Sequence, residues 1–150
     1  MIAIRPIERD DYSAWRPLWD GYNAFYGREG PTALPEAITV ATWERFFDPA
    51  EPVHALVAVD EGRLVALVHY LFHRSTTRLR DICYLQDLFT VPVRRGQGLG
   101  RRLITAVYEA ARAAGSTRVY WQTQETNRTA RELYDKVANH HGFIVYSQEL

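Results

Sequence analysis

The spacing of hydrophobic residues in the first half of the chain predicts a strand, two helices and a hairpin. Residues 2–6 alternate as a strand does, and residues 7–11 lead into a helix. Apolar residues then recur at helical spacing, namely Trp15, Leu18, Trp19, Tyr22, Phe25 and Tyr26. A loop rich in glycine and proline, 27–35, precedes a short helix that begins at Thr39 or Thr42 and carries Trp43, Phe46 and Phe47. Residues 54–59 and 64–72 predict a hairpin across Asp60, Glu61 and Gly62.

The second half predicts alternating strands and helices. The expected elements are a strand over 81–91, a helix over 98–114 that ends at Gly115, a strand over 117–123, a helix over 127–139 and a strand over 143–148. No repeat or linker divides the sequence. We therefore expect a single domain over residues 1–150, with 47% apolar and aromatic residues to build its core.

A glycine-rich turn separates the predicted strand over 81–91 from the helix over 98–114. Its sequence is Arg94-Arg95-Gly96-Gln97-Gly98-Leu99-Gly100-Arg101-Arg102. Glycines let the backbone approach a ligand closely, and the following helix offers unpaired amides and the positive end of its dipole. Arginines on both sides add positive charge, so the turn predicts a site for a pyrophosphate.

Two common nucleotide motifs do not fit this turn. A P-loop needs Gly-Lys-Ser/Thr at the start of the helix, where this chain has Gly100-Arg101-Arg102. The dinucleotide fingerprint needs a glycine where Arg101 stands, and no acidic residue follows a second strand at the expected distance. These differences argue against an NTPase and against a Rossmann fold.

A second motif follows in the last third of the chain. It consists of the strand residues 119–123, then Asn127, then a helix that ends in Leu133-Tyr134-x-Lys136, and then Gly142-Phe143. Together with Arg95-x-x-Gly98-x-Gly100, this order resembles the GNAT superfamily of acetyl-CoA-dependent N-acetyltransferases. The residues 84–89 and 120–127 are most similar to the subgroup that contains yeast histone and polyamine acetyltransferases and the diamine acetyltransferases.

The resemblance implies an α/β (α+β) fold with a mixed, mostly antiparallel central sheet, a splayed strand pair and flanking helices. It implies acetyl-CoA as co-substrate and a homodimer. The implied cofactor-binding residues are Leu88, Phe89, Thr90, Arg95, Gly96, Gln97, Gly98, Leu99, Gly100, Arg101, Asn127, Ala130 and Tyr134. On a helix, Asn127, Ala130 and Tyr134 would share one face, along which a narrow thioester arm could lie.

The chemistry of the family needs an amine, a thioester and a path for two protons. A backbone N–H near Leu88–Thr90 is expected to polarise the carbonyl, and Tyr134 to protonate the departing sulfur. Tyr134 is also compatible with a purely structural role in the core. No covalent enzyme intermediate and no metal is required. The five histidines have no metal-ligand spacing, so we expect no metal.

The acceptor side of the site is less clearly indicated. The candidate substrate-binding residues are Tyr22, Tyr26, Gln86 and Asp87. Tyr22 and Tyr26 suit a cationic amine through cation–π contact, although the aromatic stripe also suits the core. Asp87 is a candidate catalytic residue, and it fits a turn former, an amine-binding carboxylate or a relay to water. Related sequences often carry Glu-Asp at 86–87, but Gln86 accepts no proton at neutral pH.

The net charge of zero conceals an uneven distribution. Residues 1–62 hold five arginines against eleven acids, a balance of −6, and residues 63–150 carry a balance of +6. The basic half suits an anionic cofactor and the acidic half a cationic acceptor, unless both are merely solvated surfaces. Without a basic tail or domain, no nucleic acid partner is expected.

Cysteine content and hydropathy bear on the compartment. With Cys83 as the sole cysteine, no internal disulfide can form, which favours a cytoplasmic location. No leader and no membrane span are expected. Cys83 on an apolar strand suits packing better than acyl-transfer chemistry.

The sequence therefore predicts an N-acetyltransferase that moves the acetyl group of acetyl-CoA to a primary amine. The acceptor would be a small polyamine-like or diamine molecule or a lysine side chain of a peptide, attacking directly in a ternary complex. The alternative is a catalytically silent domain of the same fold that binds acetyl-CoA as a sensor or interaction module.

Overall fold

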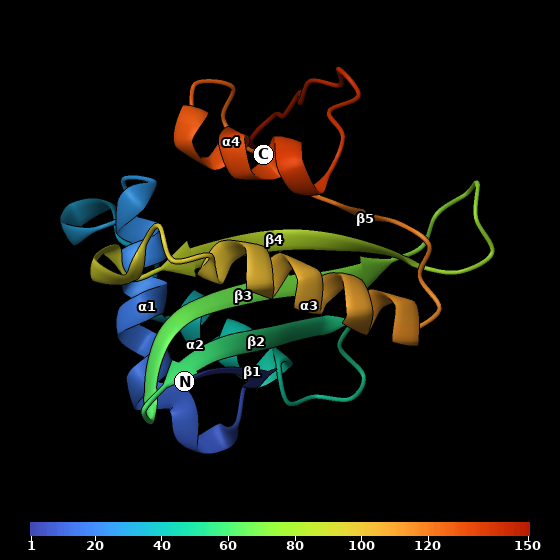
Figure 1. Ribbon diagram of the computed structural model, residues 1–150. Coiled ribbons are helices and arrows are strands. Elements are labelled where there is room, and N and C mark those ends of the chain that lie inside the picture. The colour runs from blue at the N-terminus through green and yellow to red at the C-terminus, as the bar shows by residue number, and fades with distance from the viewer.

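A five-stranded sheet with helices on both faces forms the body of the protein, and the computed structural model describes all of residues 1–150 (Figure 1). The strands are β1 (Ile2–Pro6), β2 (Val53–Asp60), β3 (Arg63–His73), β4 (Ile82–Thr90) and β5 (Val119–Tyr120). The α-helices are α1 (Tyr12–Phe25), α2 (Glu36–Arg45), α3 (Leu99–Ala113) and α4 (Arg128–Val137), and short 3₁₀ turns cover Arg9–Asp11, Gly30–Thr32 and Pro92–Arg94.

The strand order in the sheet equals the order in the chain. β1 to β4 pair antiparallel, and β5 joins β4 in parallel. The β4–β5 pairing covers only Cys83 with Val119 and Tyr84 with Tyr120. From Leu85 to Thr90, β4 therefore has no strand partner on this side. The mostly antiparallel sheet with a splayed strand pair agrees with the fold expected from the sequence.

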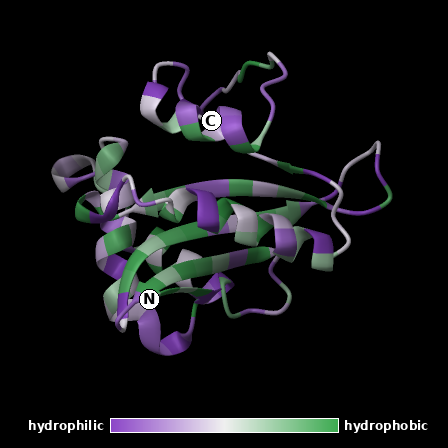
Figure 2. Ribbon diagram, viewed as in Figure 1, coloured by the Kyte–Doolittle hydropathy of each residue, from purple (hydrophilic) through white to green (hydrophobic).

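Two hydrophobic clusters, one on each face of the sheet, hold the helices in place. α3 buries Leu103, Ile104 and Val107 against β2, β3 and β4 on one face. On the other face, α1 and α2 bury Trp15, Leu18, Trp19, Tyr22 and Trp43. Strands β2 and β3 carry continuous hydrophobic runs because both of their faces are covered (Figure 2). Gly21 lets α1 approach β4 closely, since a Cβ atom there would lie 2.8 Å from the Phe89 ring.

Three expected elements differ from the structure. The strand expected over 117–123 keeps only Val119–Tyr120. α2 begins at Glu36, ahead of both threonines, with Pro35 as its N-cap, and it ends at Arg45, so that Phe46 and Phe47 lie beyond the helix. The strand expected over 143–148 does not form. Its residues lie without helix or strand, and the side chains of Phe143 and Tyr146 are 86% and 89% exposed. A strand needs a partner edge, and β5 offers only two paired residues before it diverges.

An ion pair ties β1 to the turn before α1. Both nitrogens at the end of Arg5 donate to the Asp11 carboxylate, at 2.7 and 2.9 Å, and the Glu8 amide donates to it at 2.8 Å. The hydrogen bonds from Arg5 hold the pKa of Asp11 below its ordinary value. The pair therefore stabilises the folded state above the pH at which an unfolded aspartate ionises, and this contribution is lost as the pH falls through the lowered pKa.

We expect Asp11→Asn to lower the free energy of unfolding by about 1–3 kcal/mol at pH 7, because it removes a charged hydrogen-bond acceptor. Urea denaturation at a series of pH values should show this difference shrinking progressively as the pH falls below the pKa of an unfolded aspartate. Asp10→Asn, one residue away and without an ion pair, is the matched control. An Asp11→Asn effect of equal size at pH 7 and pH 3 would contradict the ionic explanation.

No helix of the structure combines the length and the apolar character that crossing a bilayer requires.

Candidate active site

The glycine-rich turn presents a row of unpaired backbone amides at the start of α3. Gly96 and Gly98 have φ values of 76° and 79°, in the left-handed region that favours glycine. Gly98 is the N-cap of α3 and has no side chain with which to cap it. The amides of the six residues from Gly96 to Arg101 donate to no backbone or side-chain acceptor. A Cβ atom at Gly96 or Gly98 would meet no atom within 4 Å, so the space beside these two glycines is open.

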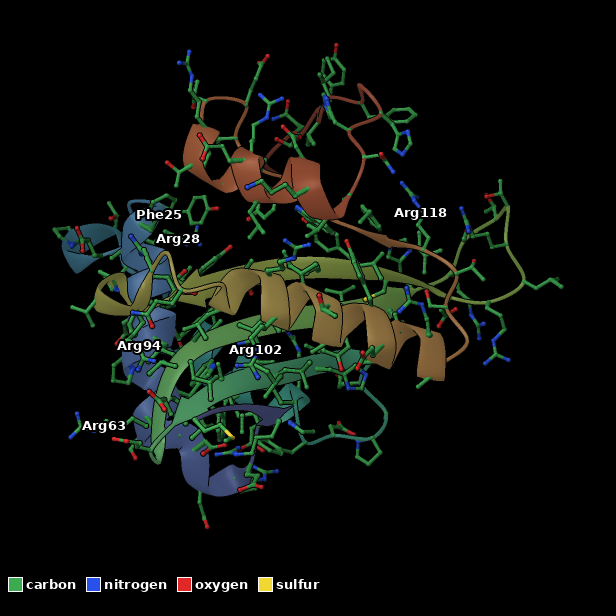
Figure 3. The ribbon with its side chains drawn as sticks, viewed as in Figure 1. Phe25, Arg28, Arg63, Arg94, Arg102 and Arg118 are labelled. Atoms are coloured by element: carbon green, nitrogen blue, oxygen red, sulfur yellow. The ribbon has the colours of Figure 1, made fainter.

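The four arginines around this turn have different surroundings, and Figure 3 labels two of them, Arg94 and Arg102. Arg94 forms an ion pair with Asp60 at 2.8 Å, and Arg102 donates to the Ile2 carbonyl at 3.0 Å. Arg95 donates through Nε to the Thr90 carbonyl at 3.1 Å and lies over the Phe89 ring. Arg101, in the first turn of α3, has no hydrogen-bonding or ionic partner. Arg94 and Arg102 are therefore engaged within the fold, and the expectation that the four arginines together favour an anion at this turn stays a prediction.

A bulge in β4 sets the orientation of Gln86 and Asp87. His69 pairs with Asp87 and Tyr70 pairs with Leu85, so Gln86 is an extra residue on β4. Gln86 is exposed, whereas Asp87 is buried on the face that carries α1 and α2. The bulge thus turns Asp87 and Gln86 toward one small cavity of about 180 Å³. Six of its ten lining residues are Trp19, Arg45, Phe46, His69, Gln86 and Asp87.

Asp87 makes its closest contact with a residue that the sequence did not indicate. Oδ2 of Asp87 lies 2.9 Å from Nδ1 of His69, and the Trp15 indole donates to Nε2 of the same ring at 3.1 Å. The sequence left His69 unassigned because the 74–81 loop before β4 hides which strand residues face each other. His69 could have been found from its position directly opposite Asp87 on the neighbouring strand, but this position is known only once the strand register is known.

Two tyrosines, Tyr22 of α1 and Tyr84 of β4, lie within electrostatic range of Asp87. Burial raises the pKa of Tyr22, and the neighbouring Asp87 carboxylate raises it further. Burial also raises the pKa of Tyr84, with smaller contributions from Tyr120, Asp87 and Tyr26. The rings of Tyr22 and Tyr26 lie 5.2 Å apart, and the Arg28 guanidinium lies over both of them. A cation of the protein itself therefore already contacts the two rings that were expected to bind an amine.

α4 carries the remaining candidate residues. Asn127 is the N-cap of α4, and its Oδ1 accepts a hydrogen bond from the Ala130 amide at 3.3 Å. Tyr134 is half-buried, and its ring meets Trp121 edge to face at 5.4 Å. Burial raises the pKa of Tyr134, and nearby Tyr26 raises it further. The structure thus brings Tyr134 of α4 and Tyr26 of α1 within electrostatic range of each other. Leu133 lies against Gly100, which joins α4 to the start of α3.

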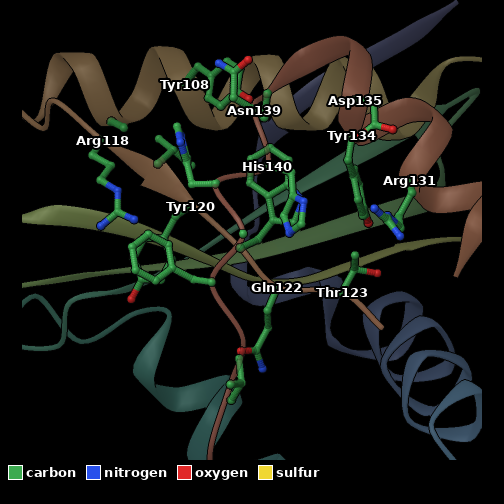
Figure 4. A pocket seen from close by; sticks show the side chains of 18 of the residues that line it. Tyr108, Arg118, Tyr120, Gln122, Thr123, Arg131, Tyr134, Asp135, Asn139 and His140 are labelled. Carbon is green, nitrogen blue, oxygen red and sulfur yellow. The ribbon is translucent and has the colours of Figure 1, made fainter. Parts of the chain in front are cut away.

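A larger cavity than that at Asp87, about 1080 Å³ in volume, lies elsewhere (Figure 4). It is bounded by the end of α3, β5, α4 and the segment 138–145. Tyr134 points into it from α4, but no residue of the glycine-rich turn and no residue of the Asp87 cavity lines it. The strand expected over 143–148 does not form here, and its residues Phe143, Ile144 and Val145 line the cavity while they stay exposed.

Two further expectations can be compared with the structure. Cys83 is completely buried, and burial raises the pKa of its thiol to about 12, which makes it a packing residue and no nucleophile. Several acids of the first half form ion pairs on the surface, namely Asp11, Asp20, Glu36, Glu44 and Asp60. None of the first-half acids lines the cavity at Asp87, so the acidic balance does not describe that cavity.

Several known proteins are similar to this chain in sequence or in fold. The D-amino-acid N-acetyltransferase of Saccharomyces cerevisiae is 33% identical over 149 residues, which are 98% of this chain and 90% of the relative. The thialysine N-epsilon-acetyltransferase of Bos taurus is 37% identical over 65 residues, 43% of this chain and 38% of the relative. An aminoglycoside N-acetyltransferase solved in complex with CoA has a TM-score of 0.82 at 16% identity, covering 99% of this chain and 95% of that one.

The family profile decides the assignment. The profile of the Acetyltransferase (GNAT) family matches residues 12–139, from the first residue of α1 to beyond the end of α4. This range contains the glycine-rich turn, the β4 bulge and Tyr134, and it agrees with the relative that covers nearly the whole chain. The protein therefore belongs to the GNAT family of acetyltransferases.

Proposed function

We propose that this protein transfers the acetyl group of acetyl-CoA to the amine of a small acceptor, bound at Asp87. The row of six unpaired amides from Gly96 to Arg101 carries this proposal, because an anion is the complement of such a row at a helix N-terminus. Arg101 supplies a free positive charge beside it. Acetyl-CoA carries a pyrophosphate that matches this donor set.

The residues near the turn fit the rest of acetyl-CoA. Asn127 and Ala130 stand at the start of α4, and Leu88, Phe89 and Thr90 form the unpaired edge of β4, where backbone amides could orient a thioester carbonyl. Arg95 and Gln97 hold the turn itself, through bonds to the Thr90 carbonyl and the Arg94 guanidinium. When bound, acetyl-CoA supplies an activated acetyl group on sulfur.

Each residue then has a limited task. Asp87 binds the acceptor as an ammonium ion and accepts its proton, directly or through water, so that the free amine forms the new bond to the acetyl carbon. Tyr134 holds a proton for the sulfur whose bond to carbon breaks. Its raised pKa keeps the phenol protonated at neutral pH, as a general acid requires.

The cavity at Asp87 favours an acceptor that carries both an amine and a carboxylate. Asp87 is the only carboxylate among its lining residues, whereas a polyamine would profit from several. Arg45, at the end of α2, lines the same cavity without an ionic partner and suits a carboxylate. Trp19 and Phe46 offer apolar contact between the two charges. The name of the yeast relative, a D-amino-acid N-acetyltransferase, supports an amino acid as the acceptor.

For Arg45→Gln we expect the KM for an amino acid acceptor to rise about 10-fold, since one charge-assisted hydrogen bond is removed. The amide of the same amino acid lacks the carboxylate, so its KM should be the same for the parent protein and for Arg45→Gln. Steady-state kinetics with this pair of acceptors tests the assignment. Equal changes for the acid and its amide would contradict a role of Arg45 in carboxylate binding.

The function itself is tested by thiol release from acetyl-CoA over a panel of D- and L-amino acids, diamines, polyamines, aminoglycosides and basic peptides. We expect release with amino acids, matched by an equal amount of N-acetylated product in mass spectrometry. Binding of acetyl-CoA without transfer to any acceptor would instead favour a catalytically silent sensor or interaction module.

A further inference from the structure

The buried ring of His69 is fixed from both sides. Its side chain is packed among aromatic rings, with centroids 5.4 Å from Trp19 and 4.8 Å from Phe46, and the residue is 3% exposed. Both ring nitrogens nevertheless have partners, Trp15 at Nε2 and Asp87 at Nδ1. A core histidine without a task would need only to satisfy these nitrogens, but here one partner is the carboxylate of the proposed acceptor site.

The Trp15 contact determines where the imidazole proton lies. An indole N–H only donates, so Nε2 of His69 must accept and carries no hydrogen. The hydrogen of the neutral ring is then on Nδ1, from which it is donated to Oδ2 of Asp87 at 2.9 Å. In this arrangement His69 has no free lone pair with which to act as a base.

The same contact leaves the negative charge of Asp87 available. No arginine or lysine forms an ion pair with Asp87, although Arg45 lines the same cavity. Its hydrogen-bonding partner is the neutral His69 ring from β3, and the Tyr22 phenol from α1 lies within electrostatic range. A carboxylate that is nine-tenths buried and unpaired with a cation favours a cationic ligand, because burial strengthens its electrostatic interactions.

We propose that His69 is a positioning residue, fixed by Trp15 as the neutral Nδ1–H form, which aims the Asp87 carboxylate at the ammonium group of the acceptor. This inference rests on the proposed acetyl transfer for its functional meaning. It assigns the binding of the amine to Asp87 and excludes His69 as the base, so His69 contributes to acceptor binding through the orientation of Asp87.

Two substitutions at His69 separate its two hydrogen bonds. In His69→Asn, the side-chain amide nitrogen takes the place of Nδ1 and still donates to Asp87. In His69→Gln, the amide oxygen takes the place of Nε2, and it accepts from Trp15 while the donor to Asp87 is lost. The two variants therefore differ in whether a donor to Asp87 is present, and both replace the imidazole by a smaller amide side chain. Circular dichroism and acetyl-CoA calorimetry on both variants control for folding and for the cofactor site.

We expect His69→Gln to raise the KM for the acceptor about 10-fold to 100-fold, with the dissociation constant of acetyl-CoA unchanged. His69→Asn should stay within about 3-fold of the parent KM. If His69→Asn were as impaired as His69→Gln, or if neither KM changed, the positioning role would be overturned. A loss of kcat with unchanged KM in His69→Asn would indicate a base and would also overturn it.

A measurement on the unmodified protein needs neither a variant nor turnover. Long-range ¹H–¹⁵N correlation spectra of histidine-labelled protein at pH 7 should show His69 protonated on Nδ1 and unprotonated on Nε2. A proton on Nε2 would overturn the inference even if acetyl transfer is active. Failure of every acceptor to react would reject the proposed function, while the ring would still show its Nδ1–H form.

Discussion

We expect Tyr134→Phe to lower kcat about 10-fold or more while the affinity for acetyl-CoA changes little. General acids contribute about 10² to 10⁴ in rate, and water substitutes for part of the lost proton donor. The phenylalanine ring keeps the edge-to-face contact with Trp121, so packing is preserved. Because burial raises the pKa of Tyr134, the parent enzyme should keep this contribution through neutral pH and lose it only as the pH rises through that raised value.

Tyr108→Phe is the matched control for this substitution. The Tyr108 phenol is also partly buried and lines the same large cavity, but its hydroxyl donates to the Val137 carbonyl at 2.8 Å and has no assigned chemical task. We expect a small loss of stability and the parent kcat. Single-turnover kinetics identifies the chemical step in each protein. A parent-like chemical rate in Tyr134→Phe would return Tyr134 to a structural role.

The second large effect is expected at the glycine-rich turn. Gly98→Asp places a negative side chain in the open space before the unpaired amides and should weaken acetyl-CoA binding about 100-fold or more. Gly98 has a φ of 79°, so the substitution also strains the backbone. Titration calorimetry measures the affinity, and urea denaturation measures the strain.

Gly62→Asp separates the two causes. Gly62 has a φ of 78° with nothing within 4 Å of a Cβ atom, and it lies in the β2–β3 turn, outside the proposed acetyl-CoA site. It should therefore reproduce the loss of stability without the loss of affinity. Parent-like acetyl-CoA binding in a folded Gly98→Asp protein would contradict the proposed location of the pyrophosphate.

Most of the fold could be predicted because its elements bury residues at regular spacing. β1, the β2–β3 hairpin, β4 and α3 lie within a few residues of their expected bounds. The failures occur where pairing between distant segments decides. The 117–123 segment keeps only two strand residues, and the apolar 143–148 segment forms no strand, since hydrophobic alternation does not reveal whether a partner edge exists.

The candidate site shows the same limit. The glycine-rich turn is a local motif that the sequence indicated directly, and Asn127 and Tyr134 were indicated by a local pattern that resembles the family. His69, Trp15 and Arg45 reach Asp87 from β3, α1 and α2, and only the strand register and the helix packing bring them together. Charge counts also do not reveal which arginines have protein partners, since Arg94 pairs with Asp60 of β2 and Arg102 donates to the Ile2 carbonyl of β1.

The most direct test of the central claim is a titration of ¹⁵N-labelled protein with acetyl-CoA, followed through the backbone amides. The titration distinguishes two candidate places for the cofactor, the unpaired amides of the turn before α3 and the 1080 Å³ cavity beside the C-terminal segment. The account predicts that the largest shifts occur at Gly96–Arg101, with smaller ones at Leu88–Thr90 and Asn127. Shifts confined to Ser116–Thr117 and 140–145, with Gly96–Arg101 unchanged, would contradict it.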